Sequence, residues 1–210
     1  MSEVSIEQHH GHHVSEAEKA RSIDNQKFAM WLFIASETII FSTLIAAWVV
    51  FRVNSPEVVK EVHEALGLGG ILIVTFNSFL LLTSSWAMVM GLREMQKGNR
   101  DGLLRWFTIV ALLGVAFLAL QYYEYNQLAA KGIALGYNPE EFPGFGQHFY
   151  APTAFHGAHV IVGVLWCLEV MRRARKGRYD DNVAGVEVFG LYWHYVDVVW
   201  IFLFTLIYLV

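Results

Sequence analysis

The sequence predicts an all-α, polytopic membrane protein with five transmembrane helices. Of its 210 residues, 55% are hydrophobic and only 16% are charged, which is more apolar than a soluble domain of this size requires. Apolar runs of about 20 residues or more occupy approximately 28–51, 68–90, 103–125, 152–171 and 188–210. Helices of this length can cross the hydrocarbon core of a bilayer. We therefore expect a membrane domain over 28–210, preceded by a polar cytoplasmic tail over 1–27.

The distribution of Lys and Arg predicts the orientation of these helices. Twelve lie in the tail and in the loops after the second and fourth runs, whereas three lie in the other two loops. Because basic residues are enriched on the cytoplasmic side of membrane proteins, we expect the amino terminus in the cytoplasm and the carboxyl terminus outside. The tail has no apolar stretch of the kind that a cleavable signal peptide needs.

Composition also disfavours several classes of function. The small net charge of −4 gives no indication of nucleic-acid binding. The single Cys167 has no second thiol to pair with, so we interpret it as a packing residue and expect neither a disulfide nor a thiolate metal site within the chain. His9, His10, His12 and His13 could bind a divalent ion weakly, but we expect this polar tract to be solvated.

The segment 126–151 is rich in Gly, Pro and aromatic residues, so it is not expected to be helical. Pro152 suits the first turn of the fourth helix, where its missing N–H would be unpaired in any case. The small residues Gly157, Ala158 and Gly163 then predict close contact between the fourth helix and a neighbour.

Titratable side chains within the membrane runs are the candidate functional residues. Glu37 and Asp197 each lie about 13 Å from the predicted cytoplasmic boundary, given the helical rise per residue, whereas Glu124, His156 and His159 are expected in a shallower layer near the outer face. A carboxylate at the membrane centre costs about 2.5–3.5 kcal/mol even on lenient scales, so it needs a partner or a path to water. The candidate proton- or lipid-associated residues are Glu37, Asp197, His194, Glu124, His156 and His159.

These residues allow three kinds of interpretation. A bis-histidine haem needs two facing histidines at one depth, but His156 and His159 are expected near the outer face and His194 nearer the cytoplasm, so no metal or haem site is predicted in this chain. A small proton-coupled transporter would use Glu37 and Asp197, yet no run is broken at mid-membrane and no inverted repeat is visible. Alternatively, the residues join helices, lipid headgroups or partner subunits.

Basic and aromatic residues at the ends of the runs are candidates for contact with lipid headgroups. A Lys or Arg near the surface attracts anionic lipid by about 1 kcal/mol, and Trp favours the membrane interface. The candidates are Arg52, Arg93, Arg105 and Trp106.

Five motifs occur in an order that resembles a known family. WLFIASETIIF and TFNSFLLLTSSWAM in the first two runs are followed by LQYYEYNQL, FYAPTAFHGAHVIVG and YWHYVDVVWIFLF. This order resembles subunit III of the haem–copper terminal oxidases, which use cytochrome c or quinol as electron donor. The resemblance covers roughly residues 28–210 and fits the shorter, five-helix bacterial form, since mitochondrial members have additional helices at the amino end.

The resemblance implies an accessory core subunit of a proton-pumping oxidase in the aerobic respiratory chain of a bacterial cytoplasmic membrane. In that family haem and copper sit in subunits I and II, and subunit III supports proton uptake and protects the enzyme during turnover. Its intramembrane glutamate, matched here by Glu37, lies against a lipid-filled cleft, so phospholipids are expected partners beside subunits I and II. The resemblance leaves open a place in a respiratory supercomplex. A related subunit of nitric oxide reductase is the alternative within the resemblance.

Overall fold

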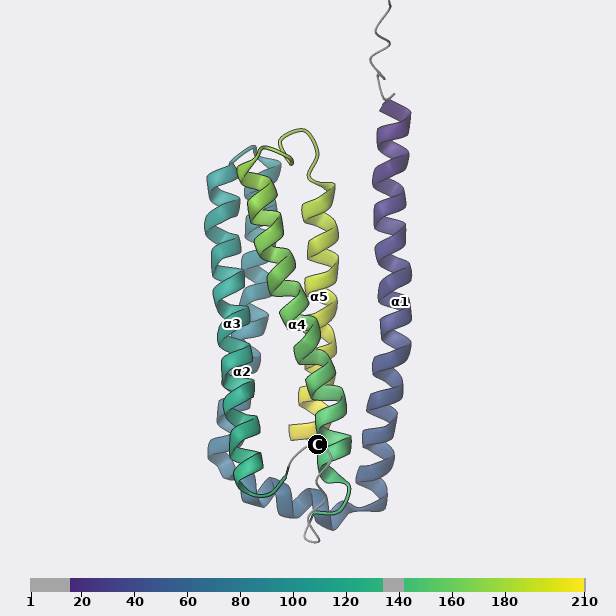
Figure 1. Cartoon of the computed structure of the whole chain (residues 1–210), viewed down its shortest axis with the longest axis vertical. Helices are drawn as coiled ribbons and strands as arrows, with labels where there is room; N and C mark the ends of the chain where they lie inside the picture. The colour runs from purple at the N-terminus through teal and green to yellow at the C-terminus, as the bar shows by residue number, and fades with distance from the viewer. Residues whose placement is uncertain (1–15, 134–141, 210) are drawn as a thin grey trace, which may run out of the picture.

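The computed structural model describes residues 16–133 and 142–209. These residues form α1 (Glu16–Asn54), α2 (Pro56–Gln96), α3 (Arg100–Ala130), α4 (Phe145–Arg175), α5 (Ala184–Phe204) and a final π-helical turn, η1 (Thr205–Leu209) (Figure 1). Five helices are long and apolar enough to cross a membrane, and the described residues contain no strand, so the predicted fold class is confirmed. The cytoplasmic position of the amino terminus stays a prediction. The tail histidines His9, His10, His12 and His13 lie outside the described residues.

Several helices extend beyond the apolar runs. α1 begins at Glu16, inside the predicted polar tail, and α4 begins at Phe145, inside the segment that was not expected to be helical. Pro152 therefore lies in the interior of α4, and its predicted place in the first turn is wrong. α4 starts early because Gly144 adopts a left-handed conformation, with φ 78°, that glycine tolerates. The buried rings of Phe145 and Phe149 then stabilise the added turns.

α2 consists of two parts joined at Gly67, whose φ of 64° and ψ of 179° break the helix. The part over 56–66 crosses one end of the bundle (Figure 1), and its own residues Val59 and Val62 are buried. The part over 67–96 runs along the bundle. A residue with a Cβ atom rarely adopts the conformation of Gly67, so this glycine sets the direction of the chain between the two parts.

The two ends of the bundle differ in chemistry. We call the end that carries the loops 97–99 and 176–183 the basic end, and the end that carries η1 the C-terminal end (Figure 1). At the basic end Arg100 and Asp180 form an ion pair that joins the start of α3 to the loop 176–183. α1 continues past the rest of the molecule at this end (Figure 1).

α1 stands beside the bundle of α2 to α5 (Figure 1). Only 11% of its most apolar stretch is buried, compared with 50% for α5. Lys27 of α1 pairs with Glu187 of α5 over 2.7 Å near the basic end. Near the C-terminal end the rings of Trp48 and Phe51 contact Phe145 of α4. α1 is thus attached near both ends, and two grooves remain between it and the bundle.

The core of the bundle is built around two tryptophans of α5. The indole nitrogens of Trp193 and Trp200 each donate to a serine hydroxyl of α2, Ser84 and Ser78, over 2.9 Å. Gly163 of α4 lies against the Trp193 ring so closely that an added Cβ atom would sit 2.5 Å from it. The predicted close helix contact at Gly163 is therefore confirmed, and it is made with α5.

Candidate functional site

Glu37 of α1 and His159 of α4 face each other across the interface between these helices. Glu37 Oε2 lies 3.3 Å from His159 Nε2, and the side chains are 13% and 12% exposed. His159 Nδ1 lies 2.9 Å from the carbonyl oxygen of Phe155. Because a carbonyl can only accept, Nδ1 carries a proton and Nε2 is the nitrogen that faces the carboxyl group. Glu37 Oε2 itself has no aligned hydrogen-bond partner among the described residues, so His159 Nε2 is its polar neighbour.

This pairing corrects the two-layer arrangement expected from the sequence. His159 was placed near the outer face because the fourth helix was expected to begin at 152, whereas α4 begins at Phe145. The additional turns move His159 deeper along the helix, to the level of Glu37. The expected partner for the deep carboxyl group is thus a histidine of the same chain.

An apolar groove opens beside this pair, between α1, α4 and α5. Its walls come from Met30, Phe33, Glu37, Phe155, Ala158, His159, Val162, Trp166 and Tyr192. The Tyr192 hydroxyl donates to the carbonyl oxygen of His159 over 2.9 Å, which holds α5 against α4 at this level. Glu37 and His159 therefore provide the polar groups of a surface otherwise suited to hydrocarbon.

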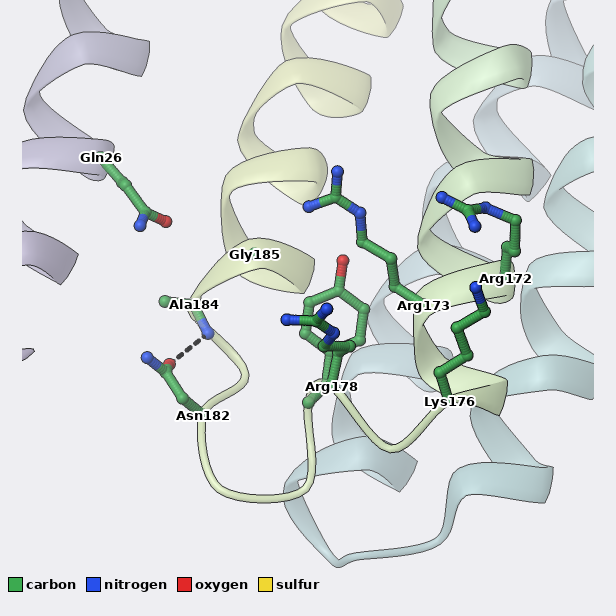
Figure 2. A pocket seen from close by; sticks show the side chains of 9 residues that line it. Gln26, Arg172, Arg173, Lys176, Arg178, Asn182, Ala184 and Gly185 are labelled. Atoms are coloured by element: carbon green, nitrogen blue, oxygen red, sulfur yellow. Dashed lines mark hydrogen bonds between the residues drawn. The ribbon is translucent and has the colours of Figure 1, made fainter. Parts of the chain in front are cut away.

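A basic pocket lies at the end of the same helices (Figure 2). Its basic side chains are Arg172, Arg173, Lys176 and Arg178. Gln26 of α1 and Tyr179 also line this pocket. Burial raises the pKa of the Tyr179 hydroxyl, so this group stays neutral and can donate a hydrogen bond. The pocket offers several donors and a net positive charge to an anion.

Glu169 offsets part of this positive charge. Its carboxylate accepts from Arg172 Nε over 2.6 Å and from Arg173 Nε over 2.8 Å. These side chains are substantially exposed, and exposed ion pairs contribute little to stability. The ion pairs orient both guanidinium groups, while Lys176 and Arg178 carry no ion pair to any described residue.

Asp197 and His194 lie on α5 against α2. His194 Nδ1 is 2.6 Å from the hydroxyl oxygen of Ser85. Asp197 is 3% exposed, and neither of its carboxyl oxygens has an aligned hydrogen-bond partner within the described part of the chain. The Ser85 hydroxyl lies near Asp197 as well, but it is aligned with His194. The two α5 residues thus belong to the α2/α5 contact, away from the groove beside Glu37.

The other two candidate residues are used for contacts between helices. Glu124 Oε1 accepts from the hydroxyl of Tyr208 in η1 over 2.7 Å, inside the C-terminal end. His156 is fully buried, and its Nε2 lies 3.2 Å from the carbonyl oxygen of Val196. His156 and His159 are each held by contacts of their own, so they do not form a facing pair of ligands. In residues 16–133 and 142–209 no three His, Cys, Asp or Glu side chains gather as a metal site would require.

The four lipid-headgroup candidates separate into two groups. Arg52 is at the C-terminal end, where its Nη1 donates to the carbonyl oxygen of Leu206 over 3.1 Å. Arg93 and Arg105 are exposed near the basic end, and Trp106 packs edge-to-face on Trp86. Arg52 therefore has a contact within the protein, and lipid binding by all four stays a prediction.

Comparison with known proteins identifies the family. The family model described as cytochrome c oxidase subunit III matches residues 2–210. The chain belongs to this family. It is 38% identical to cytochrome c oxidase subunit 3 of Synechocystis sp. over 95% of this chain and 79% of that protein. It is 34% identical to the Bacillus sp. (strain PS3) protein of the same name, with 88% and 86% covered. A quinol oxidase subunit 3 from Bacillus subtilis is 31% identical, with 85% and 84% covered.

The resemblance read from the five motifs is thus confirmed. This subunit III is a multi-pass membrane protein of a haem–copper terminal oxidase complex. The family favours the oxidase interpretation over the transporter and nitric oxide reductase alternatives. Its motifs carry the contacts described above, since SET in α1 holds Glu37 and FHGAH in α4 holds His156 and His159.

The basic pocket was not recognised as a site from the sequence. The run Arg172–Arg178 was counted only as evidence for topology. Five basic residues within seven positions were an available signal for anion binding. The position of Gln26 and Tyr179 around that run could be learned only from the folded chain.

Proposed function

We propose that this subunit III has no redox centre and supports proton uptake by a proton-pumping oxidase, holding a phospholipid between α1 and the α4/α5 pair. The observation that carries the proposal is the alignment of the groove with the basic pocket on α4. His159, Val162, Trp166, Arg173 and Lys176 follow one another at spacings of three or four residues or their sum. Such spacings place side chains on one face of a helix.

The alignment matches the two parts of a phospholipid. The basic pocket suits a phosphate, because guanidinium and ammonium groups form charge-assisted hydrogen bonds with phosphate oxygens. The apolar groove suits an acyl chain. The helical distance from Arg173 to His159 is about 21 Å, and half of the hydrocarbon core is about 15 Å thick. The distance along α4 is thus long enough to accompany an acyl chain from its headgroup through the inner half of the bilayer. A chain whose headgroup sits in the pocket therefore runs toward Glu37 and His159.

The distribution of basic residues supports the orientation. The basic end faces the cytoplasm by the positive-inside rule, which places the lipid in the inner leaflet of a bacterial cytoplasmic membrane. Glu37 then lies at the level of the inner half of the bilayer, where a proton taken up from the cytoplasm passes on its way to the catalytic subunit. Glu37 Oε2 and His159 Nε2 lie 3.3 Å apart, so in this proposal a proton can pass between them with little movement.

Haem and copper belong to partner subunits I and II in this proposal. In support, His156, His159 and His194 bond to groups of this chain and face different helices. The chain thus contributes packing, lipid and proton-exchanging groups to the complex.

The test purifies the assembled oxidase through this chain and compares its phospholipid, haem and copper content. Arg173→Gln with Arg178→Gln removes two charges of the pocket, and Arg175→Gln is the matched control, since Arg175 is exposed near the same end but does not line the pocket. We expect the double variant to lose bound phospholipid and to inactivate sooner during turnover, with haem and copper unchanged. Equal lipid content and lifetime in both variants would contradict the lipid role. Loss of haem on gentle removal of this subunit would contradict its redox-silent role.

A further inference from the structure

We infer that a second, anionic phospholipid binds at the C-terminal end, in the corner where α1 passes into α2. This site is separate from the groove beside Glu37 and does not depend on the function proposed above. Arg52, Lys60 and His63 line a pocket of about 580 Å³ at this corner. That volume falls within the range of about 300–1,000 Å³ found for small-molecule sites.

Two of these side chains are held in place by the end of the chain. Arg52 Nη1 donates to the carbonyl oxygen of Leu206 over 3.1 Å, and His63 Nε2 donates to that of Ile207 over 2.8 Å. Both carbonyls belong to the last turns of the final helix, where such groups lack partners within the helix. The pocket is therefore preorganised. Arg52 and His63 are already ordered in the folded subunit, so a ligand does not have to immobilise them when it binds.

The charge of the corner suits a phosphate diester. Arg52 and Lys60 bring two fixed positive charges, and Glu64 is the single acidic side chain among the lining residues. Lys60 is exposed and forms no ion pair with any described residue. Arg52 uses Nη1 for Leu206, so the rest of its guanidinium fork can face the ligand.

Apolar side chains lead from the charged corner along α2, which is the reason for choosing a lipid over a soluble anion. Val53, Val59, Leu68 and Ile71 line the same pocket as the charged side chains. Leu68 is 80% exposed, and Leu72, one turn further along the same face, is 65% exposed. Free phosphate would gain nothing from this surface, whereas an acyl chain covers it.

The kink at Gly67 produces this combination. The part of α2 over 56–66 lies across the bundle and carries Lys60 and His63, while the part that begins at Gly67 runs along the bundle and carries the apolar wall. A continuous helix would direct the two sets of side chains along one axis. The corner therefore presents charge where a headgroup would lie and apolar surface where the upper part of its chain would follow.

The test uses the intact oxidase complex in nanodiscs that contain phosphatidylglycerol or phosphatidylcholine. A photoactivatable phosphatidylglycerol is added, and adducts on the peptide over 56–76 are counted by mass spectrometry. Lys60→Gln removes one charge without breaking a described contact. Glu57→Gln is the control, because Glu57 is an exposed residue of the same segment that does not line the pocket. We expect Lys60→Gln to weaken labelling about fivefold and Glu57→Gln to leave it unreduced.

Several outcomes would overturn the inference. Equal labelling by phosphatidylglycerol and phosphatidylcholine analogues would show that the corner does not select an anionic headgroup. Loss of labelling in inorganic phosphate at constant ionic strength would assign the site to a soluble anion. Equal labelling of the Lys60→Gln and Glu57→Gln complexes would remove the charge argument. Arg173→Gln with Arg178→Gln should not change labelling of this peptide, so the two lipid sites can fail independently.

Discussion

Glu37 Oε2 of α1 and His159 Nε2 of α4 lie 3.3 Å apart across the interface between these two helices. The tautomer is fixed by the Phe155 carbonyl, which occupies Nδ1–H. In the function proposed here, Glu37 and His159 act on the oxidase through proton movement or through the lipid in the adjacent groove. These two routes can be separated by substitution.

Glu37→Gln keeps the shape of the side chain and removes its titration. We expect the complex to assemble and to turn over, with a changed pH profile, pumping ratio or operational lifetime, measured by oxygen uptake and proton release in vesicles. A residue that acts directly in proton transfer at a reacting group contributes about 100-fold or more, so a loss of that size with normal assembly would make Glu37 catalytic. An unchanged profile, ratio and lifetime would leave it a structural residue. Arg173→Gln with Arg178→Gln should alter lifetime but leave the pH profile unchanged.

The predicted orientation of the chain, with the amino terminus in the cytoplasm, can be tested by the accessibility of its loops. In a Cys167→Ser background, Glu57→Cys should react with a membrane-impermeant maleimide in intact cells, whereas Asp181→Cys should react only after the membrane is opened. Both positions are exposed, so access depends on the side of the membrane. Labelling of Asp181→Cys alone in intact cells would reverse the topology.

Gly163→Ala should destabilise the bundle. The added Cβ atom would lie 2.5 Å from the Trp193 ring, and the ring cannot easily retreat because it is fully buried and its indole nitrogen is bonded to Ser84. Overpacking of this kind costs about 1–3 kcal/mol. We expect a lower unfolding temperature for this subunit within the complex.

Gly69→Ala is the matched control for this substitution. Gly69 is also helical, but a Cβ atom added there would have nothing within 4 Å of it. Alanine at this position should be neutral or slightly stabilising, because it restricts the unfolded chain. Equal stability of both variants would show that the contact between Gly163 and Trp193 is looser than described.

The number and order of the membrane helices could be predicted because spanning length and apolar composition are properties of continuous segments. The helix ends could not, since α1 continues into the polar segment from Glu16 to Lys27 and α4 begins at Phe145. Polar residues can form helix outside the hydrocarbon core, where hydropathy gives no signal. Because α4 begins before the expected start at 152, His159 lies deeper along the helix than the sequence predicted.

The chemistry of Glu37 was predictable in part. Its depth required a partner, but the identity of that partner depends on how α1 and α4 are placed against each other. The helical register within one segment does not contain this information. In the same way, Tyr208 could not be assigned to Glu124 from the sequence, because the two are 84 residues apart in the chain.

Tyr208 and Glu124 provide the last prediction. The Tyr208 hydroxyl donates to Glu124 Oε1 over 2.7 Å, and both side chains are buried at the C-terminal end. Tyr208→Phe removes the donor and leaves a buried carboxyl oxygen without it, which costs about 1–3 kcal/mol. We expect the subunit to dissociate from the purified complex at lower detergent concentration and to unfold at lower temperature.

The double substitution Tyr208→Phe with Glu124→Leu tests whether the stability lost in Tyr208→Phe is lost because the Glu124 carboxyl group has no hydrogen-bond donor. Replacement of both partners by apolar groups removes the unpaired atom, and such replacements can be nearly neutral. We therefore expect the double variant to recover much of the stability lost in Tyr208→Phe, as measured by thermal unfolding of the complex. If Tyr208→Phe alone has no effect, the hydrogen bond does not hold η1 against α3. If the double variant is less stable than the single one, Glu124 has another stabilising partner, and the assignment of its role to Tyr208 is wrong.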